Sequence, residues 1–316
     1  MSRLAGKQRY LEMLKTAFGP DILKYLDGKQ VIEVMRNPNG RVFVEDLRRG
    51  KYLTDTVLPS DQAENIIKLV AAFKNDIADS EHPMVSAELP IHGARFQGWL
   101  PPVVAEPTFA IRKRALQIFT LEHYRDAEVL SREGYKILKD AMHTRQNIMI
   151  VGGTGSGKTT FANALLATLR GAQDRVLVLE DLRELQLDME DVVFMESTPS
   201  VSMRDLVKGA LRMRPDRIVV GEVRDGAALD MLKAWNTGHP GGICTIHANS
   251  VESAPYRLED LIQEVAVTVP RNLILQAVNL FVFLEKTPEG HRGIADIARL
   301  DGYLDGRYLL TSLLEK

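Results

Sequence analysis

The chain has 316 residues, 45% of them hydrophobic and 26% charged, which allows two folded domains and excludes a disordered protein. Lys and Arg total 40 against 42 Asp and Glu, so the net charge of -2 excludes an overall basic field for nucleic acid and leaves only a local basic groove open. The single Cys244 excludes an internal disulfide and a cysteine zinc site, and the N-terminus lacks the apolar core of a signal peptide. We therefore expect a cytoplasmic protein. Because no window approaches the ~20 apolar residues that span a bilayer, membrane contact would run through partners or the surface.

The first part of the chain, residues 1–122, mixes helix and strand signals. Apolar residues recur at helical spacing over 9–27, and residues 30–46 give two strand patterns around an Asn-Gly turn, which is typical of a hairpin. A second helix is predicted with Ser60 as its N-cap, and short strand-like runs punctuated by Pro and Gly follow. The sequence therefore predicts a smaller α+β domain with an antiparallel sheet.

After a linker predicted at 123–134, residues 135–316 alternate helical patterns with apolar strands. Buried strands are predicted at 147–153, 175–181, 217–223 and 242–248. Strands of this kind, each followed by a helix, indicate an α/β domain with a mostly parallel sheet that is covered on both faces. The segment after residue 279 predicts three or more antiparallel strands joined by Gly-containing turns.

A phosphate-loop pattern is the strongest signal in the sequence. A strand runs into a helix through Gly152, Gly153, Thr154, Gly155, Ser156, Gly157, Lys158, Thr159 and Thr160. The glycines let backbone N–H groups turn inward around a phosphate, and the helix N-terminus adds positive potential. Lys158 would reach the β- and γ-phosphates, and the Thr159 hydroxyl would bind Mg²⁺, so ATP and Mg²⁺ are the expected ligands. The alternative is a Gly-rich turn that only caps a helix; the full order of strand, loop, Lys-Thr and helix disfavours it.

Acidic residues end two of the predicted strands. Glu180 and Asp181 could hold the water shell of a metal or position the attacking water, whereas Asp181 suits a helix N-cap equally well. Glu222 is the carboxylate available at the end of the next strand before a helix starts, so it could face the γ-phosphate as a general base. Its alternative is an ion pair with Arg224 or another surface base.

His247 ends a further strand. A histidine there could sense the γ-phosphate and couple its presence to strand movement. A buried histidine with satisfied hydrogen bonds is the other interpretation, and the chemistry of the residue alone does not separate the two.

These segments together resemble a known family. The order of phosphate loop, "LED", "LRMRPDRIVVGEVR" and "TIHA", over about Ile148 to Asn249, is similar to that of the secretion ATPases, the RecA-like motors of type II and type IV secretion and of type IV pili. The stretch "GARFQGWLPPVVAEPTFAIRKR" is similar to the end of the family's N-terminal domain, where basic residues reach nucleotide bound between the domains. The resemblance implies that Arg112 contacts phosphate, with Arg95 and Arg114 as further candidates. The alternative for these arginines is a solvated β-edge.

The resemblance also assigns roles. It implies that Glu222 is the general base, that Glu180 assists by orienting water or metal, and that His247 belongs to the family's histidine box. Thr159 would then be the main protein ligand of the metal.

Within the family, one cysteine cannot build the zinc module of many pilus and type II members, and nothing here matches the C-terminal "AIRN"-like stretch of retraction motors. The sequence resembles instead the TrbB-type conjugal transfer ATPases. That implies a cytoplasmic, hexameric ring at the inner membrane, held by membrane subunits of a conjugation apparatus and driving pilus assembly or substrate transfer. The alternatives are a pilus or type II secretion motor, and a nucleic-acid translocase. The near-neutral charge and the lack of a basic-aromatic stretch speak against the translocase, so no sequence-specific nucleic-acid binding is expected.

Overall fold

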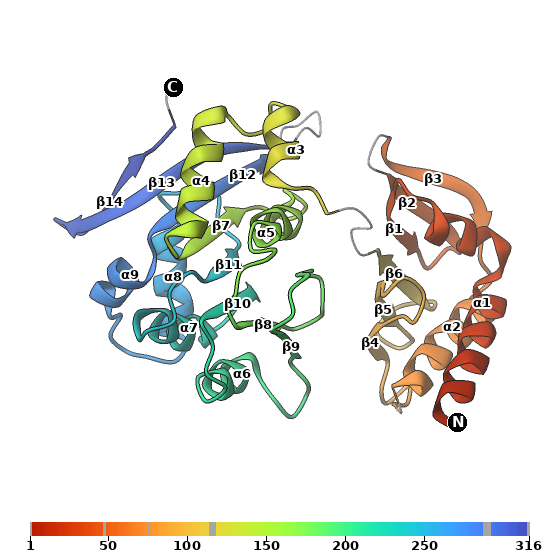
Figure 1. Ribbon diagram of the computed structural model, residues 1–316. Coiled ribbons are helices and arrows are strands. Elements are labelled where there is room, and N and C mark those ends of the chain that lie inside the picture. Colours follow the sequence, from red (N-terminus) through yellow and green to blue (C-terminus); the bar gives the residue numbers. More distant parts are fainter. Residues whose placement is uncertain (1, 47–48, 75, 114–117, 287–291, 315–316) are drawn as a thin grey trace. The chain divides into compact units, whose positions relative to one another are not determined.

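The computed structural model describes residues 2–46, 49–74, 76–113, 118–286 and 292–314 (Figure 1). The chain divides into two compact units, Met1–Leu116 and Gln117–Lys316. Each unit has a sheet and a hydrophobic core of its own. Among the helices in the described ranges, none is both long and apolar enough to cross a membrane.

The first unit is a helix pair on an antiparallel sheet. Its elements are α1 (Ser2–Asp27), β1 (Val31–Arg36), β2 (Arg41–Asp46), β3 (Gly50–Val57), α2 (Ser60–Phe73), β4 (Met84–Glu88), β5 (Arg95–Trp99) and β6 (Thr108–Arg112). The sheet order is β3-β2-β1-β6-β5-β4, and every neighbouring pair is antiparallel. Side chains alternate between buried and more exposed along β5 and β6, and the buried face packs with apolar residues of α1 and α2. The predicted α+β fold of this part is confirmed.

Helix α1 is kinked where a single regular helix was predicted. Gly19 has φ 71° and ψ 171°, outside the helical region, and Pro20 has no N–H to donate. The break leaves carbonyl groups of the preceding turn without their usual donor. The Gln62 side chain of α2 donates from Nε2 to the Ala17 carbonyl at 2.7 Å, so the neighbouring helix satisfies one of them.

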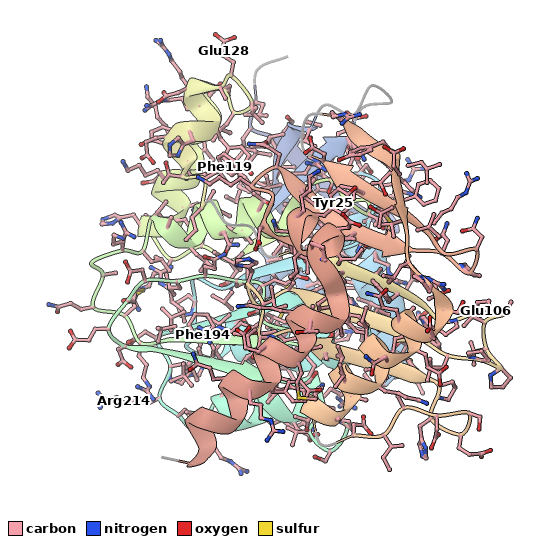
Figure 2. All side chains as sticks on the ribbon, turned by 90° about the vertical axis from the view of Figure 1, so that its right-hand side faces the viewer. Tyr25, Glu106, Phe119, Glu128, Phe194 and Arg214 are labelled. Atoms are coloured by element: carbon pink, nitrogen blue, oxygen red, sulfur yellow. The ribbon has the colours of Figure 1, made fainter. Side chains whose placement is uncertain are left out.

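The part of α1 after the kink also contacts the sheet. Tyr25, labelled in Figure 2, lies half-buried near the end of the helix. Its hydroxyl is 3.3 Å from the hydroxyl of Thr56 in β3, within hydrogen-bond distance. The helix is therefore held to the sheet by a polar contact in addition to its apolar face.

The predicted N-cap of α2 is wrong by one residue. Ser60 is the first residue of the helix, and the N-cap position is Pro59, whose side chain has no acceptor for a capping hydrogen bond. The Ser60 hydroxyl instead accepts a hydrogen bond from Nη2 of the buried Arg36 at 3.1 Å. Arg36 also donates to the Leu58 carbonyl, so its guanidinium is hydrogen-bonded to polar groups at the start of α2.

The second unit is a three-layer α/β domain. It comprises α3 (Leu121–Asp126), α4 (Arg132–His143), β7 (Ile148–Gly152), α5 (Lys158–Ala167), β8 (Val176–Glu180), β9 (Val192–Glu196), α6 (Met203–Ala210), β10 (Arg217–Glu222), α7 (Ala227–Asn236), β11 (Ile243–Ile246), α8 (Ala254–Gln263), α9 (Arg271–Ala277), β12 (Leu280–Lys286), β13 (Arg292–Leu304) and β14 (Arg307–Ser312). The sheet order is β14-β13-β12-β7-β11-β10-β8-β9. One face packs against α6 to α9 and the other against α3 to α5 (Figure 1).

The sheet of the second unit is mostly parallel, as predicted. Strands β12, β7, β11, β10, β8 and β9 pair in parallel, and β13 and β14 add an antiparallel edge. Strand β12 differs from the expectation for the C-terminal segment, because it pairs in parallel with β7 on one side. The expected linker at 123–134 carries the end of α3 and the start of α4. Leu130 between these helices is buried in the core of the unit.

Candidate functional site

The phosphate loop connects β7 to α5. Gly152 ends β7, and a Cβ added there would lie 2.6 Å from the Leu284 carbonyl oxygen of β12, so a side chain does not fit. Gly157 is the N-cap of α5 with φ 96°, a conformation that favours glycine. These two glycines let the chain leave the strand and enter the helix within one tight loop.

The space beside two glycines of the loop is open. A Cβ added at Gly153 or Gly155 would meet no atom within 4 Å, so the glycines leave this space clear. The Ser156 hydroxyl is buried and has no hydrogen-bond partner among the described residues. Since buried polar groups are usually hydrogen-bonded, this hydroxyl is a candidate contact for a polar ligand. Thr159 and Thr160 lie half-buried in the first turn of α5, where the helix dipole favours an anion.

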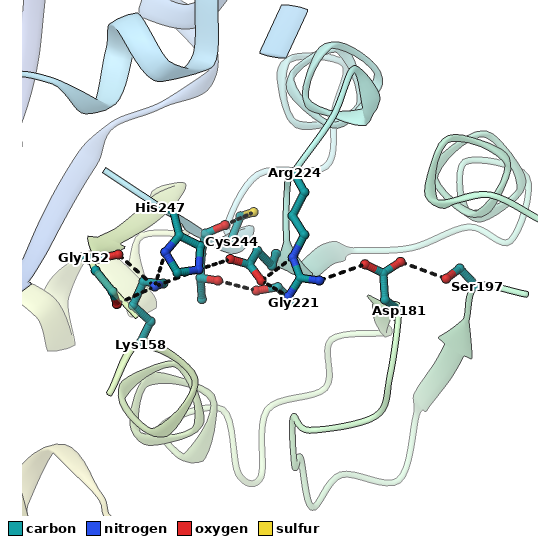
Figure 3. Close-up of polar contacts among 11 residues, drawn as sticks. Gly152, Lys158, Asp181, Ser197, Gly221, Arg224, Cys244 and His247 are labelled. Carbon is teal, nitrogen blue, oxygen red and sulfur yellow. Dashed lines mark hydrogen bonds and ion pairs between the residues drawn. The ribbon is translucent and has the colours of Figure 1, made fainter. Parts of the chain in front are cut away.

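Lys158 bridges the loop and the neighbouring strand β11. Its buried ammonium donates to the carbonyls of Gly152 at 2.8 Å and Gly153 at 3.0 Å. The same nitrogen lies 3.4 and 3.5 Å from Nδ1 and Nε2 of His247, which directly follows β11 (Figure 3). The lysine is thus held over the loop with its charge against the histidine ring.

His247 lies between Lys158 and Glu222. Its Nε2 is 2.8 Å from Oε1 of Glu222. Partial burial of the ring, together with the positive charge of Lys158, lowers the pKa of His247 below its ordinary value. The ring is therefore neutral at pH 7 and links a cation to a carboxylate.

Glu222 ends β10 beside β11, and its side chain is 16% exposed. Oε1 faces His247, and Oε2 accepts hydrogen bonds from Nε of Arg224 at 2.7 Å and from Nη2 of the same residue (Figure 3). The pairing with Arg224 that the sequence left as an alternative is present. It does not remove Glu222 from the site, because the same carboxylate also faces His247 at the phosphate loop.

Asp181 joins the site through Arg224. Nη1 of Arg224 lies 4.0 Å from Oδ2 of Asp181, and Oδ1 accepts a hydrogen bond from the Ser197 hydroxyl at 2.8 Å. The alternative of a helix N-cap does not hold for Asp181, because the next element after β8 in the chain is strand β9. Asp181 and Ser197 thus follow the ends of two adjacent strands and meet beside Arg224.

Glu180 is buried and holds a loop. Its Oε1 accepts hydrogen bonds from the backbone N–H groups of Glu184 at 3.0 Å and Leu185 at 2.9 Å. A Cβ added at the neighbouring Gly221 would lie 2.9 Å from Cγ of Glu180, so the glycine makes room for this side chain. The observed contacts of Glu180 are structural, and its role in orienting water or metal stays a prediction.

The site offers few protein ligands for Mg²⁺, so the ion would need phosphate oxygens of a nucleotide as further ligands. Within the described ranges, the side chains of His, Cys, Asp and Glu form no group of three that could hold a metal ion. Mg²⁺ keeps several waters and is usually bound by one or two protein groups plus substrate phosphates. The Thr159 hydroxyl at the start of α5 is suited to be such a group.

Arg292 is a contact of the loop that sequence reasoning missed. It is the first residue of β13, and its Nε donates to the Gly155 carbonyl at 2.9 Å. Its Cδ lies 3.7 Å from the position of a Cβ added at Gly157, so the side chain follows the loop. The two residues are 137 positions apart, and no local pattern around Arg292 signals the contact.

The predicted arginines of the first unit lie on its sheet. Arg112 is exposed at the end of β6, opposite Arg95 of β5 and Glu33 of β1. Arg114 lies outside the described residues. The proximity of Arg112 and Arg95 lowers the pKa of Glu33, but the stronger effect of burial leaves that pKa raised overall. A contact of these arginines with phosphate stays a prediction.

Known proteins resemble this chain over most of its length. The family described as "Type II/IV secretion system protein" matches residues 20–283. A conjugal transfer protein TrbB of Rhizobium radiobacter is 42% identical over 98% of this chain and 95% of its own length. A type IV secretion system protein VirB11 of Bartonella quintana (strain Toulouse) is 30% identical, with 77% of this chain and 79% of that protein covered.

A solved structure is also similar. The VirB11 ATPase of the Brucella suis type IV secretion system, crystallised with sulphate, superposes with a TM-score of 0.50 and 27% sequence identity. The match covers 93% of this chain and 96% of that one, so the likeness extends through both units.

Proposed function

Because the chain belongs to the type II/IV secretion system protein family, we propose that it is an ATPase motor of a type IV secretion system serving conjugative transfer. One observation carries the enzymatic part of this proposal. The carboxylate of Glu222 faces His247 at 2.8 Å, and His247 lies against the ammonium of Lys158 in the phosphate loop. An acceptor for a proton and a cation for phosphate therefore meet at one edge of the sheet.

The residues divide the hydrolysis of ATP among them. Lys158 and the loop amides bind the β- and γ-phosphates, and Ser156 offers its hydroxyl to the same group. Glu222 accepts a proton from a water molecule while that water's oxygen attacks the γ-phosphorus, and the bond to the β-phosphate oxygen breaks to release ADP. Thr159 would hold Mg²⁺ together with the nucleotide, and the ion would supply positive charge against the leaving group.

His247 provides the link between phosphate and base. A neutral ring that contacts both Lys158 and Glu222 responds when Lys158 turns from its loop carbonyls toward a phosphate. The ring sits directly after β11, so such a response reaches the sheet. This supports the proposal that His247 senses the γ-phosphate.

The relatives support a wider role in secretion and conjugation. We propose that the protein is cytoplasmic and forms a hexameric ring bound at the inner membrane through subunits of the conjugation apparatus. There it drives pilus assembly or substrate transfer. The first unit would serve oligomerisation and hold nucleotide, with Arg112 as its phosphate contact. A motor of a pilus or type II secretion system would use the same chemistry.

The test is steady-state ATPase activity of the wild type and of Glu222→Gln, in Mg²⁺ buffer with and without single-stranded DNA. Glu196→Gln is the matched control, since Glu196 is an exposed carboxylate at the end of β9 in the same sheet. Loss of the base typically costs about 10²- to 10⁴-fold in rate. We expect Glu222→Gln to lose that activity while nucleotide binding persists and Glu196→Gln stays active.

The proposal has two ways to fail. Undiminished hydrolysis by Glu222→Gln overturns the assignment of the base. Strong stimulation of the wild type by DNA, with a steep salt dependence, overturns the secretion motor in favour of a nucleic-acid translocase. Size measured in the same buffer tests the ring.

A further inference from the structure

We propose that Arg224 is a positioning residue for Glu222, which fixes the carboxylate so that Oε1 alone is left to accept the proton of the attacking water. The inference rests on the proposed function, because it concerns how the base of that reaction is held. Arg224 thereby has a role in the reaction, whereas its sequence position suggested only an ion pair with Glu222.

The hydrogen bonds make the two carboxylate oxygens unequal. Oε2 of Glu222 accepts from both Nε and Nη2 of Arg224, and these two donors fill its two lone-pair sites. Oε1 is buried and lies 2.8 Å from Nε2 of His247, but it accepts no hydrogen bond from the described residues. The acceptor sites left on the carboxylate therefore belong to the oxygen on the histidine side.

The backbone sets this geometry. Alternate residues of an extended chain point to the same face, so Glu222 and Arg224 lie on one face. Val223 between them is buried, and its N–H donates to the Thr245 carbonyl of β11 at 3.1 Å, which continues the hydrogen bonding one residue beyond the end of β10. Because Glu222 and Arg224 are only two residues apart, the backbone at the end of β10 positions both side chains.

Arg224 is itself anchored from the far side. Its side chain is 52% exposed, so packing alone does not hold the guanidinium. Nη1 lies 4.0 Å from Asp181, whose other oxygen accepts from the Ser197 hydroxyl (Figure 3). The guanidinium therefore lies between two carboxylates, with a hydrogen-bonded contact to Glu222 and a longer ion-pair contact to Asp181.

A lysine at this position tests the geometry against the charge alone. An ammonium keeps the charge but is a point donor, and it lacks the planar fork that places two N–H groups on Oε2. The proposal thus orders the rates: wild type above Arg224→Lys, and Arg224→Lys above Arg224→Gln. A general effect of charge on the site would leave the lysine variant equal to the wild type.

The experiment uses the full chain and measures kcat and KM for ATP, the Kd for a fluorescent ADP analogue and the melting temperature. The variants are Arg224→Gln, Arg224→Lys and Asp181→Asn, with Arg212→Gln as the control because Arg212 is an exposed arginine before β10. Arg224→Gln is also combined with Glu222→Gln. Single-turnover phosphate release with enzyme in excess gives the slow rates of that pair.

We expect Arg224→Gln to lower kcat about 10- to 100-fold, since a misplaced catalytic group costs up to about 10²-fold. The Kd should change less than about two-fold, and the single-turnover rate of Glu222→Gln should not fall further when Arg224 is also replaced. Asp181→Asn should lower kcat by a smaller factor, and Arg212→Gln should match the wild type.

Three outcomes overturn the inference while the proposed function stands: wild-type kcat in Arg224→Gln, equal fold losses from this substitution in the wild-type and the Glu222→Gln backgrounds, or a loss confined to Kd. Absence of ATP hydrolysis by the wild type would overturn the proposed function, and with it this inference. Wild-type rates in Glu222→Gln would overturn the base assignment on which both depend.

Discussion

His247 lies between a group that can only donate and a group that can only accept. The ammonium of Lys158 is 3.4 Å from Nδ1 and 3.5 Å from Nε2 of the ring. Oε1 of Glu222 lies 2.8 Å from Nε2. Protonation of the ring would place two cations side by side, which adds to the effect of burial in lowering its pKa.

The lowered pKa of His247 predicts a pH dependence of stability. The pKa of His247 is lowered in the folded protein, so the unfolded chain binds more protons and stability falls as the pH drops below about 6.5. The loss continues until the pH passes the lowered native pKa. Melting temperatures from pH 8 to pH 5.5 should fall less in His247→Gln than in the wild type. An equal fall in melting temperature with pH for the two proteins would contradict the lowered pKa of His247.

Gly221 and Glu180 give a second residue-scale prediction. A methyl group at Gly221 would lie 2.9 Å from Cγ of Glu180 and push its carboxylate from the amides of Glu184 and Leu185. We expect Gly221→Ala to cost about 1–3 kcal/mol of unfolding free energy. The control is Gly209→Ala in α6, where an added Cβ meets nothing within 4 Å and should stabilise by about 0.5–1 kcal/mol. Urea denaturation measures both, and equal effects would refute the argument.

Site residues with a local signal in the sequence could be predicted. The loop pattern indicates Lys158, and the position at strand ends indicates Glu222 and His247. The amide contacts of Glu180 depend on how residues 181–187 turn back, which no local pattern encodes. Arg224 was visible as a neighbour in sequence, but its link to Asp181 needs the pairing of β8 with β10.

At the scale of elements, strand order brings the site together. β7 pairs with β11, β11 with β10, and β10 with β8, all in parallel. Their carboxyl ends therefore meet at one edge, where the loop, His247, Glu222 and Asp181 follow one another. The alternation of strands and helices predicted this edge. It did not predict that β12 would lie beside β7, because an apolar run carries no signal of its partner.

The antiparallel edge of this sheet braces the phosphate loop, and Arg292 tests that contact. Arg292→Ala removes the hydrogen bond to the Gly155 carbonyl, which at about 1 kcal/mol corresponds to roughly five-fold weaker nucleotide binding if it stabilises the binding form of the loop. Arg299→Ala on the same strand is the control, because Arg299 pairs with Asp301 instead. Calorimetric titration with ADP measures both variants, and unchanged affinity of Arg292→Ala would rule out the brace.

At the scale of the whole molecule, the chain has separate cores. The cluster that includes Phe18 and Phe109 draws only on the first unit, and those around Phe161 and Phe281 only on the second. The change from hairpin signals to strand–helix alternation predicts a boundary after residue 122, and the two compact units divide at Leu116 and Gln117. The helix α3 is short and buries only Leu121, so it gives little periodic signal in the sequence.

Separate cores predict that the second unit folds alone. A fragment of residues 118–316 keeps every strand of the eight-stranded sheet and the loop, so it should unfold in one cooperative transition. ADP should raise its melting temperature, because the ligand binds the folded form. A fragment that melts without a transition, while the full chain melts cooperatively, would contradict the independence of this core.

Cys244 gives the protein a built-in chemical reporter. It is the chain's single cysteine, fully buried on β11 between the strands that carry the loop and the base. Burial, with the nearby charge of Glu222, raises the pKa of its thiol, and the thiolate is the form that reacts. A thiol reagent can therefore label only those molecules in which the middle of the sheet has opened. The rate of labelling therefore measures how often the sheet opens. The decrease of this rate with nucleotide concentration measures ligand affinity without a tag or a substitution.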